Sequence, residues 1–301
     1  MEAGAVSVHR TDVKSSYGND NPMRFVRFAA TLVVCWVLVG CSGTFAVVFA
    51  QDSRSPGDPD SSVRGRLSSQ VALQERRTKA NLLRSNNPQG RIIGYRSSAV
   101  EGWPVLISER LLDEQPRLTE TALTLLAEQF RKVKDVLPPQ VVTYLQDVPV
   151  WLSPEYEGFR PTGEYHPGAD WLRDQRRRPE LHRCVELTNI AILTREVQRQ
   201  PMLILHELAH AWHHQVLGFE HPEVMNAFER AVASGTYNAV KRHDGRMERA
   251  YAMANHKEYF AECSEAFFGI NDFYPFRREE LQEVDPEMVS LLKRLWRVGE
   301  N

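Results

Sequence analysis

The sequence lacks an excess of charge of either sign. It has 37 lysines and arginines against 39 aspartates and glutamates, a formal net charge of -2 over 301 residues. Proteins that bind nucleic acid usually carry a clearly basic surface, so this balance gives no reason to expect a nucleic-acid partner. No internal repeat is visible, which argues against a solenoid. Hydrophobic residues make up 42% of the chain, enough for one globular domain and a small accessory region.

Cysteine is also scarce, with four residues in the whole chain. Cys35 and Cys41 lie in an apolar N-terminal segment, which leaves only Cys184 and Cys263 in the body of the protein. These two have two open interpretations. They form a disulfide if the protein functions outside the cytosol, or they are two small, buried apolar side chains.

A long apolar run occupies residues 23–50, which read MRFVRFAATLVVCWVLVGCSGTFAVVFA. Arg24 and Arg27 precede its apolar part, and small residues stand just before QDS, which is the order of a secretory signal. Two alternatives remain. The sequence LVGC ending at Cys41 resembles a bacterial lipobox, and the uncut run is about long enough to anchor the chain in a bilayer. We therefore expect export from a bacterial cell, with a product that is secreted, periplasmic or attached to the membrane.

Three further regions divide the chain. Residues 1–22 are a polar extension without structural meaning if Met23 is the true start. Residues 51–89 begin with QDSRSPGDPDSSVRG, which is rich in Ser, Pro, Asp and Gly and predicts a disordered linker. Residues 90–301 then form the folded domain.

Within that domain, short β-branched runs come first and helical spacing dominates later. We expect strands at residues 91–95, 105–108, 148–153 and 184–192, a helix at 118–137 and a loop at 154–179. From residue 200 onward we expect a helix that ends at Gly218, two more at 226–240 and 255–268, and a last one beginning at Asp285 and Pro286. A small mixed sheet followed by a helical half is an α+β arrangement.

The most informative motif lies in residues 204–214, ILHELAHAWHH. His206, Glu207 and His210 form an HExxH pattern, and two histidines four residues apart on a helix face the same way. Neutral imidazoles in that arrangement suit Zn²⁺, and Glu207 beside the first ligand can reach a water next to the ion. Apolar residues surround the motif, so its polar groups would be costly to bury without a partner. A metal site is the better explanation.

His213 and His214 follow the motif but do not extend it. On an ideal helix His213 lies about 10.5 Å along the axis from His206, which is too far for one ion. The longer metzincin motif would need glycine at position 213 and histidine at 216, whereas this chain has His213 and Val216. We interpret both histidines as polar or packing residues.

A catalytic zinc ion needs a third protein ligand and an open position. In residues 255–268, NHKEYFAECSEAFF, the glutamates at 258, 262 and 265 share one helical face, where like charges repel unless a positive group faces them. Asn255 and Glu258 also fit a helix-start pair, but that explanation leaves Glu262 and Glu265 unaccounted for. We therefore expect Glu258 to be the third ligand.

HELAH followed by Tyr251 and by NHKEYFAE, residues 255–262, resembles the catalytic domain of anthrax lethal factor and its relatives. These are zinc metallopeptidases of the zincin superfamily, of the gluzincin type. The resemblance covers about the last hundred residues and implies a zincin-like fold with one Zn²⁺. The implied roles are metal ligands at His206, His210 and Glu258, a catalytic base at Glu207, support of a ligand histidine at Glu262, and stabilisation of the transition state at Tyr251. Glu265, on the same helical face, is a second candidate for holding a ligand histidine. Toxin activity is not implied, because the large toxin domains have no room in this chain.

We expect an exported zinc metallopeptidase that acts on a peptide or protein substrate. Two alternatives stay open: a zinc amidase acting on cell-wall peptides, and a non-catalytic binding module braced by zinc. Peptidases of this kind commonly pair an extended substrate with a sheet edge. Residues 184–189, CVELTN, are the candidate edge strand, although an interior strand would look the same. Residues 268–281 form either one wall of the cleft or part of the core.

Overall fold

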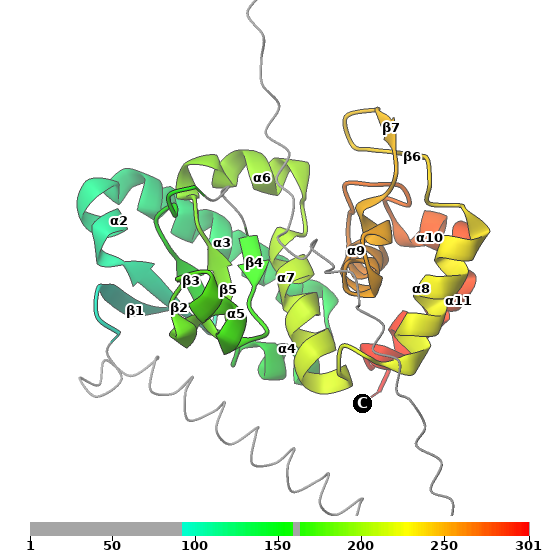
Figure 1. Cartoon of the computed structure of the whole chain (residues 1–301), viewed down its shortest axis with the longest axis horizontal. Helices are drawn as coiled ribbons and strands as arrows, with labels where there is room; N and C mark the ends of the chain where they lie inside the picture. The colour runs from blue at the N-terminus through cyan, green and yellow to red at the C-terminus, as the bar shows by residue number, and fades with distance from the viewer. Residues whose placement is uncertain (1–91, 159–162, 301) are drawn as a thin grey trace, which may run out of the picture. The chain divides into compact units, whose positions relative to one another are not determined.

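A five-stranded mixed sheet forms the first half of this computed structural model, which describes residues 92–158 and 163–300 (Figure 1). The strands are β1 (Tyr95–Val100), β2 (Trp103–Ser108), β3 (Val150–Leu152), β4 (Gly163–Tyr165) and β5 (Val185–Leu187). Their order in the sheet is β1-β2-β3-β5-β4. The inner strands β2, β3 and β5 run parallel, whereas β1 and β4 are antiparallel to their neighbours and form the two edges.

Helices connect the parallel strands. Between β2 and β3 lie α2 (Glu109–Glu114), α3 (Pro116–Val136) and α4 (Pro139–Leu145); between β4 and β5 lie α5 (Ala169–Asp174) and the 3₁₀ turn η2 (Pro179–Leu181). The turn η3 (Ile190–Ile192) and α6 (Leu193–Arg199) follow β5. Proline stands in the first turn of α3, and Pro138 follows its last residues. Proline is favoured at the first position of a helix, and it cannot continue a helix that precedes it. The sequence therefore predicts both ends of α3.

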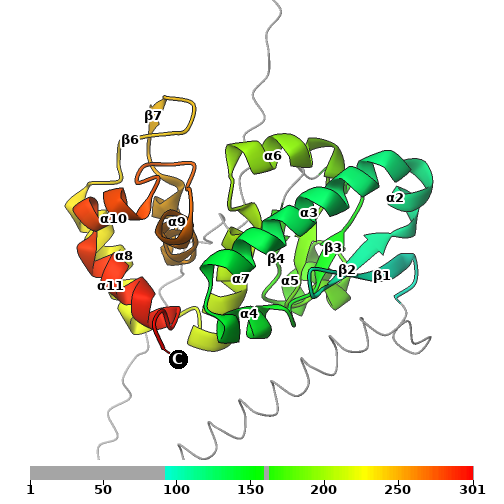
Figure 2. The same cartoon turned by 180° about the vertical axis from the view of Figure 1, so that it is seen from behind.

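The second half is helical apart from a small hairpin. It contains α7 (Leu203–Trp212), the π-helical turn η4 (His213–Leu217), α8 (Pro222–Ser234), the 3₁₀ turn η5 (Tyr251–Met253), α9 (His256–Phe268), α10 (Arg278–Val284) and α11 (Pro286–Leu295). The hairpin pairs β6 (Val240–Lys241) with β7 (Met247–Glu248). Helix α7 contacts α3 and β4 as well as α9, and both views show it between the sheet and α9 (Figures 1 and 2).

The sheet separates two apolar clusters. The larger one lies under α3 and α7 and includes one face of each inner strand, with Val105, Val150 and Val185. The smaller one lies on the other face and consists of Tyr95, Leu106, Trp151, Leu172, Leu181 and Cys184. Because alternate residues of a strand face opposite sides, strands buried on both faces read as continuous apolar runs, as in WPVLIS of β2.

The predicted α+β order is confirmed, but several element boundaries were wrong. The first strand lies at Tyr95–Val100 rather than 91–95, because Glu101 and Gly102 form its hairpin turn with positive φ angles of 51° and 97°. The expected loop at 154–179 contains β4 and α5, and α10 was not expected at all. Helix α8 replaces the expected helix at 226–240: Pro222 begins it, and Gly235, with φ 70°, ends it.

Two further expectations are settled by the fold. Cys184 and Cys263 are both free and buried, in different apolar clusters, so the apolar interpretation holds and the disulfide does not. The strand in residues 184–189 is not an edge, since β5 lies between β3 and β4. The edge on that side of the sheet is β4.

The predicted N-terminal extension, signal or anchor, and linker lie outside the described residues. Within residues 92–158 and 163–300, no helix is long and apolar enough to cross a membrane.

Candidate metal centre

The polar side chains of helix α7 lie among apolar neighbours. All ten of its residues are buried, including His206, Glu207 and His210. The flanking leucines and alanines hold the helix in the main core, so the side chains of the motif are almost entirely shielded from bulk water. Groups buried in this way must find partners inside the protein.

The partner helix is α9, and its start determines where Glu258 lies. The side-chain oxygen of Asn255 accepts hydrogen bonds from the backbone N–H groups of Lys257 and Glu258, at 2.9 and 3.1 Å. This cap begins the helix at His256 and turns the Glu258 carboxylate toward α7. The capping interpretation of Asn255 is therefore confirmed, and it is compatible with the ligand interpretation of Glu258.

The three expected ligands meet at one point. Glu258 Oε2 lies 3.2 Å from His206 Nε2 and 3.3 Å from His210 Nε2, and the two Nε2 atoms are 3.1 Å apart. All three side chains are buried, and together they could hold a metal ion. The second carboxylate oxygen of Glu258, Oε1, is buried without a hydrogen-bond partner among the described residues.

The charges in this cluster depend on one another. Burial by itself raises the pKa of the Glu258 carboxyl, but the imidazoles of His210 and His206 outweigh burial and hold that pKa well below its ordinary value of 4.5. Burial by itself lowers the pKa of His206, but its contacts with Glu258 and Glu265 raise that pKa well above the ordinary 6.5. The carboxylate is thus stabilised as an anion by the two imidazoles that face it.

Glu265 contacts the far nitrogen of His206, a role that we had predicted for Glu262 with Glu265 as the second candidate. His206 Nδ1 lies 2.7 Å from Glu265 Oε1, and Gln200 Nε2 donates to the same oxygen at 2.8 Å. Glu262 is buried nearby, within 4.8 Å of both groups, and the Asn271 side chain lowers its pKa in part. Burial and the charges of Asp272 and Glu265 raise the pKa of Glu262 well above its ordinary value. The spacing of Glu265, seven residues after Glu258, made it a candidate, but the sequence did not distinguish it from Glu262.

Glu207 faces the edge of the sheet. The backbone N–H of Tyr165 in β4 donates a hydrogen bond to Glu207 Oε2 at 2.8 Å. Burial raises the pKa of Glu207, although the nearby imidazoles of His206 and His210 lower it in part. A buried carboxylate with a raised pKa beside a cation site has the properties of a general base. Nothing in the sequence indicated that a strand backbone would hold it.

The remaining expected residues lie close by. Tyr251 is in η5, directly before α9, half-buried and packed against the main core; its predicted role as a hydrogen-bond donor to the transition state stays a prediction. His213 lies in η4 beside Phe219 and Phe260, and burial and neighbouring cations lower its pKa to about 2. Such a ring stays neutral and packs as an apolar group, as predicted.

His214 also has a structural partner, since its Nδ1 lies 2.8 Å from the Tyr165 hydroxyl. In residues 268–281, Phe273 is buried in the main core, which supports the core interpretation for that part of the segment.

Comparison with protein-family models, with curated protein sequences and with solved structures finds no match for this chain.

Proposed function

We propose that this protein is a zinc-dependent metallopeptidase with a zincin-like catalytic domain. The observation that carries the proposal is the convergence of His206, His210 and Glu258 from two helices, with Glu207 beside them. Ligands of a tetrahedral zinc ion at about 2.0–2.1 Å are about 3.3 Å apart. The separations of 3.1 to 3.3 Å between the three ligand atoms fit such an ion. The unpartnered, buried Glu258 Oε1 is a further reason to place a cation there.

The donor set favours zinc over harder cations. Two imidazoles and one carboxylate are typical of catalytic zinc, whereas magnesium and calcium prefer oxygen ligands. Three protein ligands leave a fourth position for water or substrate, which a closed structural site would not. A zinc ion bound here would polarise a peptide carbonyl and lower the pKa of water.

The protein's own groups then perform the proton transfers. Glu207 accepts a proton from the attacking water and passes it to the leaving amine, a role worth about 10²–10⁴ in rate. Its Oε2 is held by the Tyr165 N–H, so Oε1 is left for this proton. Glu265 keeps His206 in the orientation that directs Nε2 at the ion. The Tyr251 hydroxyl donates to the negative oxygen that develops on the carbonyl.

The edge strand β4 supports a peptide as the substrate. Glu207 lies against this edge and occupies the Tyr165 N–H, so a peptide lying along β4 would pass close to Glu207 and would pair with the main-chain groups of the edge that Glu207 leaves free. Main-chain pairing of this kind recognises an extended peptide rather than a particular side chain. The chemistry therefore fits a peptide or protein substrate, and our proposal includes export, which is the prediction made from residues 23–50.

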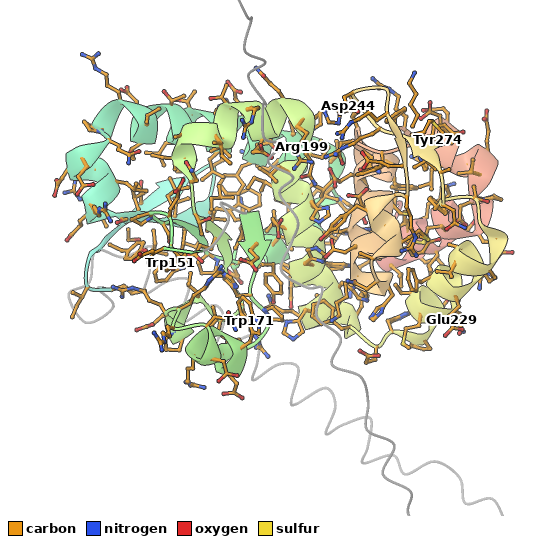
Figure 3. The ribbon with its side chains drawn as sticks, turned by 45° about the horizontal axis from the view of Figure 1, so that its top comes forward. Trp151, Trp171, Arg199, Glu229, Asp244 and Tyr274 are labelled. Carbon is orange, nitrogen blue, oxygen red and sulfur yellow. The ribbon has the colours of Figure 1, made fainter. Side chains whose placement is uncertain are left out.

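The decisive experiment replaces Glu207 with glutamine. We expect Glu207→Gln to bind as much zinc as the wild type in elemental analysis but to lose about 10²–10⁴ in kcat on a fluorogenic peptide library. Glu229→Gln is the matched control, because Glu229 lies exposed on α8 (Figure 3). Full peptidase activity in Glu207→Gln would refute the mechanism. Cell-wall peptide fragments in the same panel would identify an amidase instead.

A further inference from the structure

A second buried polar cluster lies on the face of the sheet that turns away from α7. Its members are Glu164, His166, Arg177 and Glu186, none more than 5% exposed. Arg177 Nη1 bonds to Glu164 Oε2 at 2.6 Å and lies 3.8 Å from Glu186 Oε2. Glu186 Oε2 is also 3.0 Å from His166 Nε2. The metal chemistry described above uses none of these four side chains.

Aromatic rings enclose the arginine. Its guanidinium lies 5.0 Å from the ring centre of Tyr156 and 5.3 Å from that of Trp171, which is carried by α5 (Figure 3). The Tyr156 hydroxyl donates to Glu186 Oε1 at 2.7 Å. Arg177 therefore has a fixed position, set by a carboxylate in front of it and by ring faces beside it.

Stability alone is a poor reason for a buried ion pair. Removing two charges from water costs about as much as their attraction returns, and a well-packed apolar pair is often as stable or more stable. An ion pair does, however, define geometry, because a displaced partner would leave an unpaired buried charge. The ion pair therefore fixes the position of the segment that carries Glu164.

The ion pair acts on β4. Glu164 is the middle residue of this three-residue strand, which pairs with β5 on one side and forms the edge of the sheet on the other. Its neighbour Tyr165 faces the opposite side, in the main core, and donates its N–H to Glu207. The Tyr165 hydroxyl bonds to His214 and Gln215 of η4, both at 2.8 Å. Side-chain contacts therefore hold β4 on both faces of the sheet: Glu164 bonds to Arg177 on one face, and Tyr165 bonds to η4 on the other.

We propose that the Arg177–Glu164 ion pair is a positioning device for Glu207, which acts by fixing the edge strand whose Tyr165 N–H holds the carboxylate. Glu164 and Arg177 are thus positioning residues, not catalytic ones. A displacement of about 1 Å at a reacting group can cost about 10²-fold in rate, so a loosely held three-residue strand would be expensive for catalysis. This inference rests on the proposed function for Glu207.

The test replaces the ion pair by an apolar pair, Glu164→Leu with Arg177→Met, in the full chain. We expect zinc content and the melting temperature to stay close to wild type, faster hydrogen exchange of the amides from Glu164 to His166, and a fall of about tenfold in kcat. Tyr156→Phe is the matched control. It removes a hydrogen bond from the same cluster without touching β4, and its kcat should not change.

A double-mutant cycle separates positioning from general damage. In a Glu207→Gln background, the apolar pair should lower the residual kcat no further, because the group that β4 positions is already absent. An equal fall in both backgrounds, or an unchanged kcat in the apolar pair, overturns the proposal. If the apolar pair fails to fold, Arg177→Lys takes its place in the cycle, since lysine keeps the charge but not the planar fork.

The two proposals fail differently. If the wild type cleaves no peptide, or Glu207→Gln is fully active, the proposed function is wrong. The amide exchange then decides the inference alone: unchanged exchange of the β4 amides in the apolar pair would show that the ion pair does not hold the strand.

Discussion

Helices α7 and α9 form the two sides of the candidate metal centre by different means. In α7 the polar groups lie four residues or fewer apart and are buried because every neighbouring side chain is apolar. In α9 the first and last of the three glutamates lie seven positions apart. Glu258 contacts both histidines, Glu265 contacts the other nitrogen of His206, and Glu262 lies beside them. The α7 groups form a local motif, whereas the α9 groups depend on what packs against them.

The spacing within a motif shows which residues share a helix face, but it does not show what each residue on that face contacts. The spacing of His206 and His210 defines one helix face whatever surrounds it. The spacing of Glu258, Glu262 and Glu265 also defines a face, but three carboxylates on one face have several possible uses. Only the orientation of α7 against α9 assigns them. Variants in α9 therefore test the packing of α7 against α9, whereas variants in α7 test only the local motif.

The largest effect is expected from Glu258→Ala. If Glu258 is a ligand, as proposed, its removal leaves two histidines. Zinc affinity should then fall by more than 100-fold, since loss of an outer-shell partner alone costs about 10–100-fold. Competition with a chromogenic chelator measures this, with exposed Glu229→Ala as the control. Undiminished zinc binding would mean that the third ligand lies elsewhere.

Tyr251→Phe should have the next largest effect, on rate rather than on binding. If the hydroxyl donates to the negative oxygen of the transition state, kcat should fall by about 10²-fold while zinc content stays at the wild-type level. Tyr237→Phe is a useful comparison, because that buried hydroxyl bonds to Asp285 instead. A lowered melting temperature with unchanged kcat in Tyr251→Phe would reduce Tyr251 to a packing residue.

Glu265→Gln and Glu262→Gln divide the remaining acidic pair. Since Glu265 is the residue beside His206 Nδ1, its variant should lower zinc affinity by about tenfold, the low end of outer-shell effects. The Glu262 variant should change zinc affinity less. A larger loss in Glu262→Gln than in Glu265→Gln would restore our prediction from the sequence and contradict the geometry.

The smallest effect is expected from His213→Leu, three residues beyond the second ligand. Neither ring nitrogen of His213 has a hydrogen-bond partner among the described residues, so leucine removes a buried polar group at little cost in packing. We expect unchanged zinc content and an equal or higher melting temperature, in contrast to His210→Leu, which should lose the metal. Loss of zinc in His213→Leu would place that ring in the centre.

The strands show where prediction from sequence fails. The run WPVLIS in β2 is apolar on both faces and was recognised as a strand, although its first residues were missed. The strand GEY in β4 has a glycine, a buried glutamate and a tyrosine, and no apolar alternation marks it. Its side chains find partners on opposite faces of the sheet: Glu164 bonds to Arg177 on one face, and the Tyr165 hydroxyl bonds to His214 on the other. The edge was assigned to β5 for a related reason: strand order is not encoded in any single strand.

By itself, the sequence determined the α+β order, the start of α9 at its Asn255 cap, and the set of residues that could bind metal. Each of these depends on local spacing, on a cap, or on apolar residues that recur within a few positions. The tertiary structure alone decided that β4 is the edge, that Tyr165 holds Glu207, and that Glu265 supports His206. These contacts join residues 42 and 59 positions apart, so their energies belong to the packed fold and leave no periodic trace in the chain.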